Sequence, residues 1–110
     1  MMKLPLVRAS ALYSGYSCAF EIDGHHFLLL QHGANIYLIE NRCGHFGVAL
    51  NQGEIVERDG VVQIICPRHG ISFDLASGAI ANRPWENCAP VKVYQHCIEN
   101  GQVYALIDDR

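Results

Sequence analysis

The sequence lacks any apolar run long enough to cross a bilayer. Uninterrupted apolar stretches such as residues 27–30 fall far short of the roughly 20 residues that a membrane-spanning helix needs. The first residues, MMKLPLVRASALYSGYS, also lack the apolar core of an export signal, because Pro5 and Arg8 interrupt it. The sequence therefore predicts a soluble, cytoplasmic protein with no membrane partner.

An excess of basic residues is also missing. The formal net charge is -3, with 8 Lys and Arg against 11 Asp and Glu. Because binding to a phosphate backbone depends on a basic surface, we expect no nucleic acid partner. The chain has no internal repeat or low-complexity segment, and 110 residues that are 50% hydrophobic predict a single domain over residues 1–110.

Cysteine occurs in an odd number and without regular spacing. The five are Cys18, Cys43, Cys66, Cys88 and Cys97. Such a set argues against a secreted disulfide framework and favours a reducing compartment, in which cysteines are ligands or buried thiols.

No stretch sustains a helical period for three turns, so long helices are not expected. Short apolar runs rich in Val, Ile, Tyr and Phe instead alternate with turn residues. Three pairs of runs are typical of hairpins, with turns at Gly33, at Asp59-Gly60 and at Asn100-Gly101. The predicted fold class is all-β, a small antiparallel sandwich or barrel.

The region of about 41–85 differs in composition from its flanks, because glycine and proline crowd it and its apolar runs are shorter. We interpret it as an inserted subdomain that carries a binding site. Strands near residues 34–40 and 90–107 would tie its two ends into the outer sheet.

Two loops in this region hold metal-binding residue types. The first, CGH, contains Cys43 and His45, and the second, CPRHGISFDLASG, contains Cys66 and His69. Each offers one thiolate and one imidazole, which suits zinc or an iron–sulfur cluster. A common zinc finger takes both cysteines from one knuckle and both histidines from one helix, whereas each pair here is mixed. A two-iron cluster can use mixed pairs, with the cysteines on one iron and the histidines on the other.

The paired loops resemble those of Rieske ferredoxins, the electron carriers of bacterial ring-hydroxylating dioxygenase systems. The resemblance extends to IDG at 22–24, NRPWEN at 82–87 and the final hairpin PVKVYQHCIENGQVYAL. It implies a Rieske-like fold with one [2Fe-2S] cluster in a cluster-binding subdomain. By this resemblance Cys43 and Cys66 hold the inner iron, and His45 and His69 hold the outer iron.

The same resemblance implies an electron carrier that catalyses nothing alone. Such a ferredoxin takes an electron from an NAD(P)H-dependent ferredoxin reductase and passes it to a terminal oxygenase. Two alternatives remain open. A Rieske-like small subunit of assimilatory nitrite reductase would keep the fold and change the role. A Cys2His2 zinc-binding interaction module would keep the four side chains and hold no iron.

The loops also bear on the reduction potential. High-potential Rieske proteins resemble this chain but carry an extra cysteine in each loop, where this sequence has Val48 and Arg68. They also carry hydroxyl groups that donate hydrogen bonds to cluster sulfurs, where this sequence has Ile71 and Phe73. Because fewer donors disfavour the reduced cluster, we expect a low potential.

Other residues of the region are expected to shape or shield the site. Glycines 44, 47 and 70 are expected to turn with positive φ. Phe46, Ile71, Pro84 and Trp85 are expected to shield the cluster from water. The remaining cysteines, Cys18, Cys88 and Cys97, are expected to be small buried hydrophobes, and His25, His26, His32 and His96 to occupy ordinary strand or turn positions.

Overall fold

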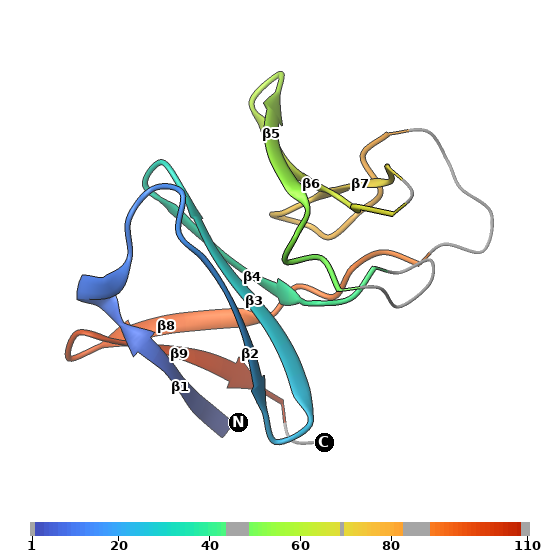
Figure 1. Cartoon of the computed structure of the whole chain (residues 1–110). Helices are drawn as coiled ribbons and strands as arrows, with labels where there is room; N and C mark the ends of the chain where they lie inside the picture. Colours follow the sequence, from blue (N-terminus) through green and yellow to red (C-terminus); the bar gives the residue numbers. More distant parts are fainter. Residues whose placement is uncertain (1, 44–48, 69, 83–88, 109–110) are drawn as a thin grey trace.

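The computed structural model describes residues 2–43, 49–68, 70–82 and 89–108 (Figure 1). The elements are β1 (Met2–Arg8), the 3-10 helix η1 (Ala9–Ala11), β2 (Ser17–Ile22), β3 (His25–His32), β4 (Asn35–Glu40), β5 (Glu54–Arg58), β6 (Val61–Ile65), β7 (Ser72–Asp74), β8 (Gln95–Glu99) and β9 (Gln102–Ile107). Within these ranges no helix is long and apolar enough to cross a membrane.

The strands form three antiparallel sheets of three strands each, in the orders β1-β9-β8, β2-β3-β4 and β5-β6-β7. The first sheet pairs the two ends of the chain. The third sheet lies beside the other two and falls within the region predicted to be inserted (Figure 1). This arrangement confirms the all-β, antiparallel prediction, whereas the boundaries 41–85 of a subdomain stay a prediction.

All three predicted hairpin turns are present. The φ angles are 53° and 81° at Asp59-Gly60 and 52° and 75° at Asn100-Gly101, and Gly33 has a φ of 62°. Two consecutive positive values match the two-residue turns that suit the twist of a hairpin. A fourth hairpin joins β2 to β3 through Asp23-Gly24, with φ angles of 51° and 80°. The sequence analysis missed it, although this dipeptide carries the same turn signal.

Strand β3 separates two hydrophobic cores. Phe27 and Leu29 pack in one core with residues of β1 and β9. Leu28 and Leu30 point to the opposite face and pack in a second core with residues of β6 and β7. All four side chains are at most 3% exposed. Burial on both faces explains why FLLL is an unbroken apolar run rather than an alternating one.

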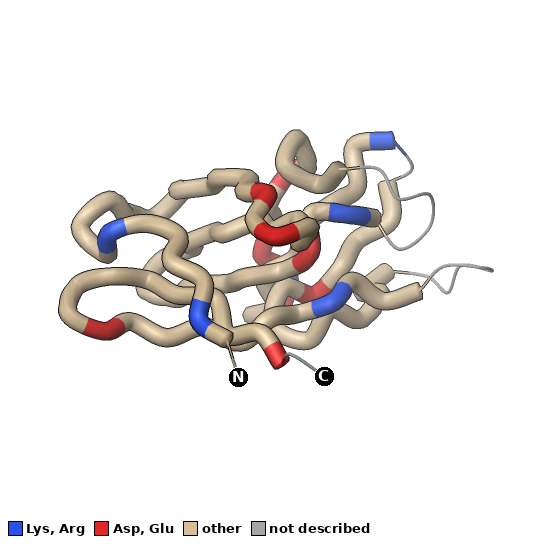
Figure 2. Tube along the Cα trace, turned by 90° about the horizontal axis from the view of Figure 1, so that it is seen from below, with Lys and Arg blue, Asp and Glu red and all other residues tan. Residues whose placement is uncertain are grey.

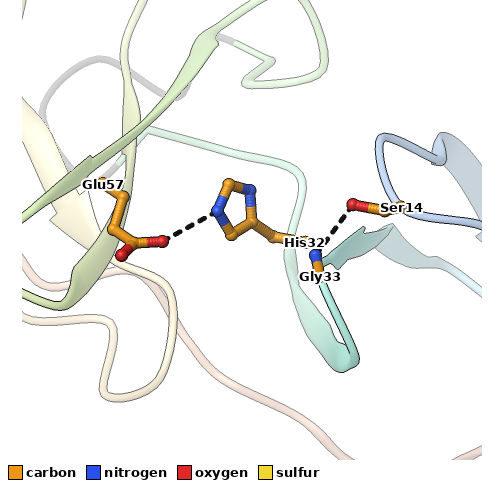
Figure 3. A network of polar contacts seen from close by, with 4 residues as sticks. All are labelled: Ser14, His32, Gly33 and Glu57. Carbon is orange, nitrogen blue, oxygen red and sulfur yellow. Dashed lines mark hydrogen bonds and ion pairs between the residues drawn. The ribbon is translucent and has the colours of Figure 1, made fainter.

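A polar contact joins the third sheet to the turn between β3 and β4. Nε2 of His32 lies 3.0 Å from Oε1 of Glu57 on β5, and the backbone N–H of Gly33 donates to Oγ of Ser14 at 2.8 Å (Figure 3). The side chains of His32 and Glu57 are 39% and 53% exposed, and their contact is an ion pair only when His32 is protonated. Such a pair stabilises by at most about 1 kcal/mol. The attachment of the third sheet therefore depends mainly on the second core.

Gly78 links the loop after β7 to the segment that leads to β8. Its N–H donates to the carbonyl of Asp74 at 2.7 Å, and its carbonyl accepts from the N–H of Val91 at 2.8 Å. Gly78 has a φ of +79°, and a Cβ added there would lie 1.9 Å from the carbonyl oxygen of Val91. Both the backbone angle and the close approach thus require glycine.

We expect Gly78→Ala to lower the free energy of unfolding more than Gly60→Ala. Gly60 has a φ of +81° and nothing within 4 Å of an added Cβ. Both variants carry the cost of a left-handed conformation, about 1–2 kcal/mol. Only Gly78→Ala adds a clash, for a further loss of about 1–3 kcal/mol, measured by denaturant unfolding. Equal losses would contradict this prediction, because they would mean that the backbone at Val91 moves freely aside.

Candidate metal centre

The structure places Cys43 and Cys66, one from each predicted loop, in the second core. Cys43 follows β4, Cys66 follows β6, and each is 1% exposed. The members of this core are Leu28, Leu30, Ile39, Cys43, Leu50, Val62, Ile64, Cys66, Ile71, Phe73, Leu75 and Val91. Two buried cysteines, one from each loop, are side chains that an iron–sulfur cluster or zinc can take as ligands.

His45 and His69 lie outside the described residues, and so do Gly44, Phe46, Gly47, Val48, Pro84, Trp85 and Cys88. No group of three or more His, Cys, Asp and Glu side chains that could hold a metal is found in the described part. That result is expected when two of the four predicted ligands are outside it. The complete ligand set therefore stays a prediction.

The second loop is a short connection from β6 to β7. The N–H of Cys66 donates to the carbonyl of Ile71 at 2.8 Å, and the N–H of Gly70 donates back to the carbonyl of Cys66 at 3.1 Å. Just beyond the loop, Ile65 pairs with Ser72. The φ of Gly70 is +72°, which confirms the positive value predicted for this glycine. The hairpin thus holds the backbone of Cys66 from both sides.

The side chain of Asn82, which lies outside the hairpin, forms two hydrogen bonds with the end of the second loop. Its Nδ2 donates to the carbonyl of Gly70 at 2.9 Å, and its Oδ1 accepts from the N–H of Ser72 at 3.2 Å. The N–H of Ala81 also donates to the carbonyl of Ser72 at 2.7 Å. The segment after β7 therefore lies along the outer edge of that strand.

Asn41 has a similar role at the base of the first loop. Its side-chain Oδ1 accepts from the backbone N–H of Leu50 at 2.8 Å, and its backbone N–H donates to the carbonyl of His26 at 2.9 Å. The sequence analysis identified neither Asn41 nor Asn82 as a site residue. Asparagine at the edge of a loop was the available signal, because its side chain readily bonds backbone groups.

Ile71 and Phe73 pack in the same core as the two cysteines. They are 0% and 1% exposed, so they exclude water on the protein side of Cys66. For Ile71 this is consistent with the predicted shielding role. Neither side chain carries a hydroxyl group that could donate a hydrogen bond to a cluster sulfur.

The remaining histidines occupy strand positions, as expected. His25, His26 and His32 lie on β3 and His96 lies on β8. Burial lowers the pKa of His96, which favours its neutral form. The expectation of burial was wrong for Cys18 and Cys97, which are only half-buried. Among the described strands, β2 and β8 lie at the edges of their sheets.

The model of the Rieske [2Fe-2S] domain matches residues 2–106. The chain belongs to the Rieske [2Fe-2S] domain family. A Rieske domain holds one [2Fe-2S] cluster, so the cofactor prediction is confirmed. The buried cysteine pair in the second core agrees with this cofactor.

Among the relatives is the 3-phenylpropionate/cinnamic acid dioxygenase ferredoxin subunit of Shigella flexneri, 30% identical over 76 residues, or 69% of this chain and 67% of the relative. A solved structure with the same fold is the complex of reduced oxygenase and oxidized ferredoxin in carbazole 1,9a-dioxygenase. The matching chain is 26% identical to this one, with a TM-score of 0.76. The match covers 94% of this chain and 100% of the other. These likenesses relate the chain to ferredoxin subunits of dioxygenases.

A protein assigned as the small subunit of an NADH-dependent nitrite reductase of Mycobacterium tuberculosis has the same fold. The TM-score is 0.80 at 17% identity, over 96% of each chain. At this identity the likeness concerns the fold alone. The fold of the Rieske domain therefore does not distinguish an electron-carrying ferredoxin from a nitrite reductase small subunit.

Proposed function

We propose that this chain is a Rieske ferredoxin that carries single electrons from an NAD(P)H-dependent ferredoxin reductase to a terminal ring-hydroxylating oxygenase. The observation that carries the proposal is the buried pair Cys43 and Cys66, one from each loop, within a Rieske domain. The dioxygenase ferredoxin relatives supply the partner class. In this role the chain catalyses no reaction alone.

In the proposed site, Cys43 and Cys66 would hold the inner iron, and His45 and His69 would hold the outer iron. The cluster, when bound, supplies one-electron redox chemistry. The chain keeps the two thiolates away from water through the apolar side chains of Leu50, Ile71 and Phe73, which are all at most 1% exposed.

Removing a proposed histidine ligand is expected to abolish the normal cluster spectrum. We expect His45→Ala and His69→Ala each to lose the Rieske absorption and EPR signals, because in either variant the outer iron loses one of its two protein ligands. His26→Ala is the matched control, since His26 is exposed on β3 and its backbone contact to Asn41 survives the change. An unaltered spectrum in His45→Ala would remove His45 from the ligand set.

Metal and sulfide analysis of the purified wild-type protein tests the zinc alternative. Iron and acid-labile sulfide in equal amounts are expected from a [2Fe-2S] cluster. A colourless protein that contains zinc and no sulfide would contradict the proposal.

The reduction potential is expected near the low end of the range for Rieske clusters, on the order of -150 mV. The reason is that Ile71 and Phe73 offer no hydroxyl donors to cluster sulfurs. Protein-film voltammetry or a dye-mediated titration gives the value. A midpoint potential above about +100 mV would contradict this interpretation, since it lies well inside the high-potential part of the class range.

Basic residues border the two cysteines. Arg42 precedes Cys43, Arg68 follows Cys66 by two positions, and both arginines are exposed. Figure 2 shows several basic positions on the described trace toward one end of the molecule. Complementary charge speeds encounter and orients transient complexes, so these arginines favour an electron-transfer partner with an acidic docking surface.

Electron transfer to the terminal oxygenase is expected to depend on Arg68. We expect Arg68→Gln to lower the second-order rate constant several-fold at low ionic strength, with a smaller effect at high salt. The measurement is stopped-flow reoxidation of the reduced protein by a Rieske-type terminal oxygenase from the same organism. Arg58→Gln, an exposed change at the distant β5–β6 end, is the control. Electron transfer that is absent in the wild type would count against the carrier role.

The nitrite reductase subunit is the second candidate, favoured by the shared fold. It would form a lasting complex with a large catalytic subunit rather than a transient one. Purification of the tagged chain from its own cells distinguishes the two. Stable co-purification with a nitrite reductase large subunit would replace the proposed function.

A further inference from the structure

Two hydrogen bonds hold the backbone of Gly70. An added Cβ at Gly70 would meet nothing within 4 Å. Its N–H donates to the carbonyl of Cys66, and its carbonyl accepts from Nδ2 of Asn82. Gly70 therefore stands between the cysteine that begins the second loop and an asparagine that lies beyond β7.

Asn82 connects two points of the loop end with one rigid group. Its donor meets Gly70 at 2.9 Å, and its acceptor meets the N–H of Ser72 at 3.2 Å. The partners fix the orientation of the carboxamide, because a carbonyl can only accept and an N–H can only donate. A carboxamide supplies both groups on one plane, which a hydroxyl of serine or a carboxylate of aspartate does not.

Ser72 and Asn82 differ in their exposure to solvent. Ser72 is 1% exposed, whereas Asn82 is exposed. Loss of the Asn82 side chain would leave the backbone N–H of Ser72 without its present acceptor. Because unmet backbone groups are costly, the loop end is expected to rearrange rather than to stay in place.

We propose that Asn82 is a positioning residue for the cluster, which acts through the peptide of Gly70 on the loop that carries Cys66 and His69. The chain of contacts runs from Asn82 to Gly70 and from Gly70 to the carbonyl of Cys66. Loops that carry ligands direct backbone N–H groups toward cluster sulfurs, and these groups tune the potential. A change at Asn82 would therefore alter the cluster without removing a ligand.

The test uses the intact, cluster-loaded protein with Asn82→Ala and Asn82→Asp. The alanine variant removes both hydrogen bonds. The aspartate variant keeps an acceptor for Ser72 and removes the donor to Gly70. The matched controls are Asn35→Ala and Asn35→Asp, because Asn35 is an exposed asparagine at the β3–β4 turn. They make the same chemical changes, including the added charge, away from the second loop.

We expect Asn82→Ala to lose its cluster to an iron chelator faster than the wild type, by roughly 10- to 100-fold, as outer-shell changes do at metal sites. We also expect shifted EPR g values and a shifted midpoint potential, which a purely structural role would not produce. Asn82→Asp is expected to show the g shift and faster cluster loss as well, since the donor to Gly70 is gone.

The inference is overturned if Asn82→Ala has the g values, midpoint potential and loss rate of its Asn35 control, or if it changes only the free energy of unfolding. Should Asn82→Ala be isolated without a cluster, unchanged g values and loss rate in Asn82→Asp overturn it instead.

This inference rests on the ligand set in the proposed function, and the two can fail separately. If His69→Ala keeps the normal spectrum, the ligand set fails whatever the Asn82 variants do. If the ligand variants lose the spectrum and the Asn82 variants match their controls, only the role of Asn82 fails.

Discussion

Four consecutive residues of β3, Phe27 to Leu30, point alternately into two cores, and none is more than 3% exposed. Each apolar side chain of this size gains about 1.5–3 kcal/mol when it leaves water. One strand thus binds the sheet of the chain ends on one face and the third sheet on the other. Separation of either sheet would expose half of this run. The exposed ion pair of His32 and Glu57 adds little by comparison.

The site depends on the second of these cores. Cys43 and Cys66 are members of it, together with Leu28 and Leu30. The cysteines are therefore placed by the same packing that attaches the third sheet to the rest of the molecule. Their side chains are held in an apolar environment, and each is 1% exposed. Such an environment suits a centre that must be protected from water on the protein side.

Two asparagine side chains hold loop backbone groups by hydrogen bonds that the apolar core cannot supply. Asn41 closes the base of the first loop through Leu50, and Asn82 closes the second through Gly70 and Ser72. Loop backbones have few ladder partners, so side chains must satisfy some of their polar groups. The carrier and the nitrite reductase subunit share the fold, so function is decided at this level of detail, in loops and exposed charges.

Features that arise from neighbouring residues could be predicted from the sequence alone. Glycine after Asp59 and after Asn100 produced the predicted hairpins, because two consecutive positive φ angles need such residues. The same rule would have found the turn at Asp23-Gly24. The spacing of the cysteines and histidines identified the family, which the match over residues 2–106 confirms. These signals are short in range, so they can be read along the chain.

Contacts between distant residues could be seen only once the strands were packed together. The sharing of a core by Leu28 and both cysteines depends on how the sheets pack, and so does the incomplete burial of Cys18 and Cys97. The side chain of Asn82 bonds Gly70 twelve residues away, and no local pattern reports such a contact. Burial and hydrogen bonding between distant segments arise only when the sheets assemble, because the hydrophobic effect depends on total buried area and not on order along the chain.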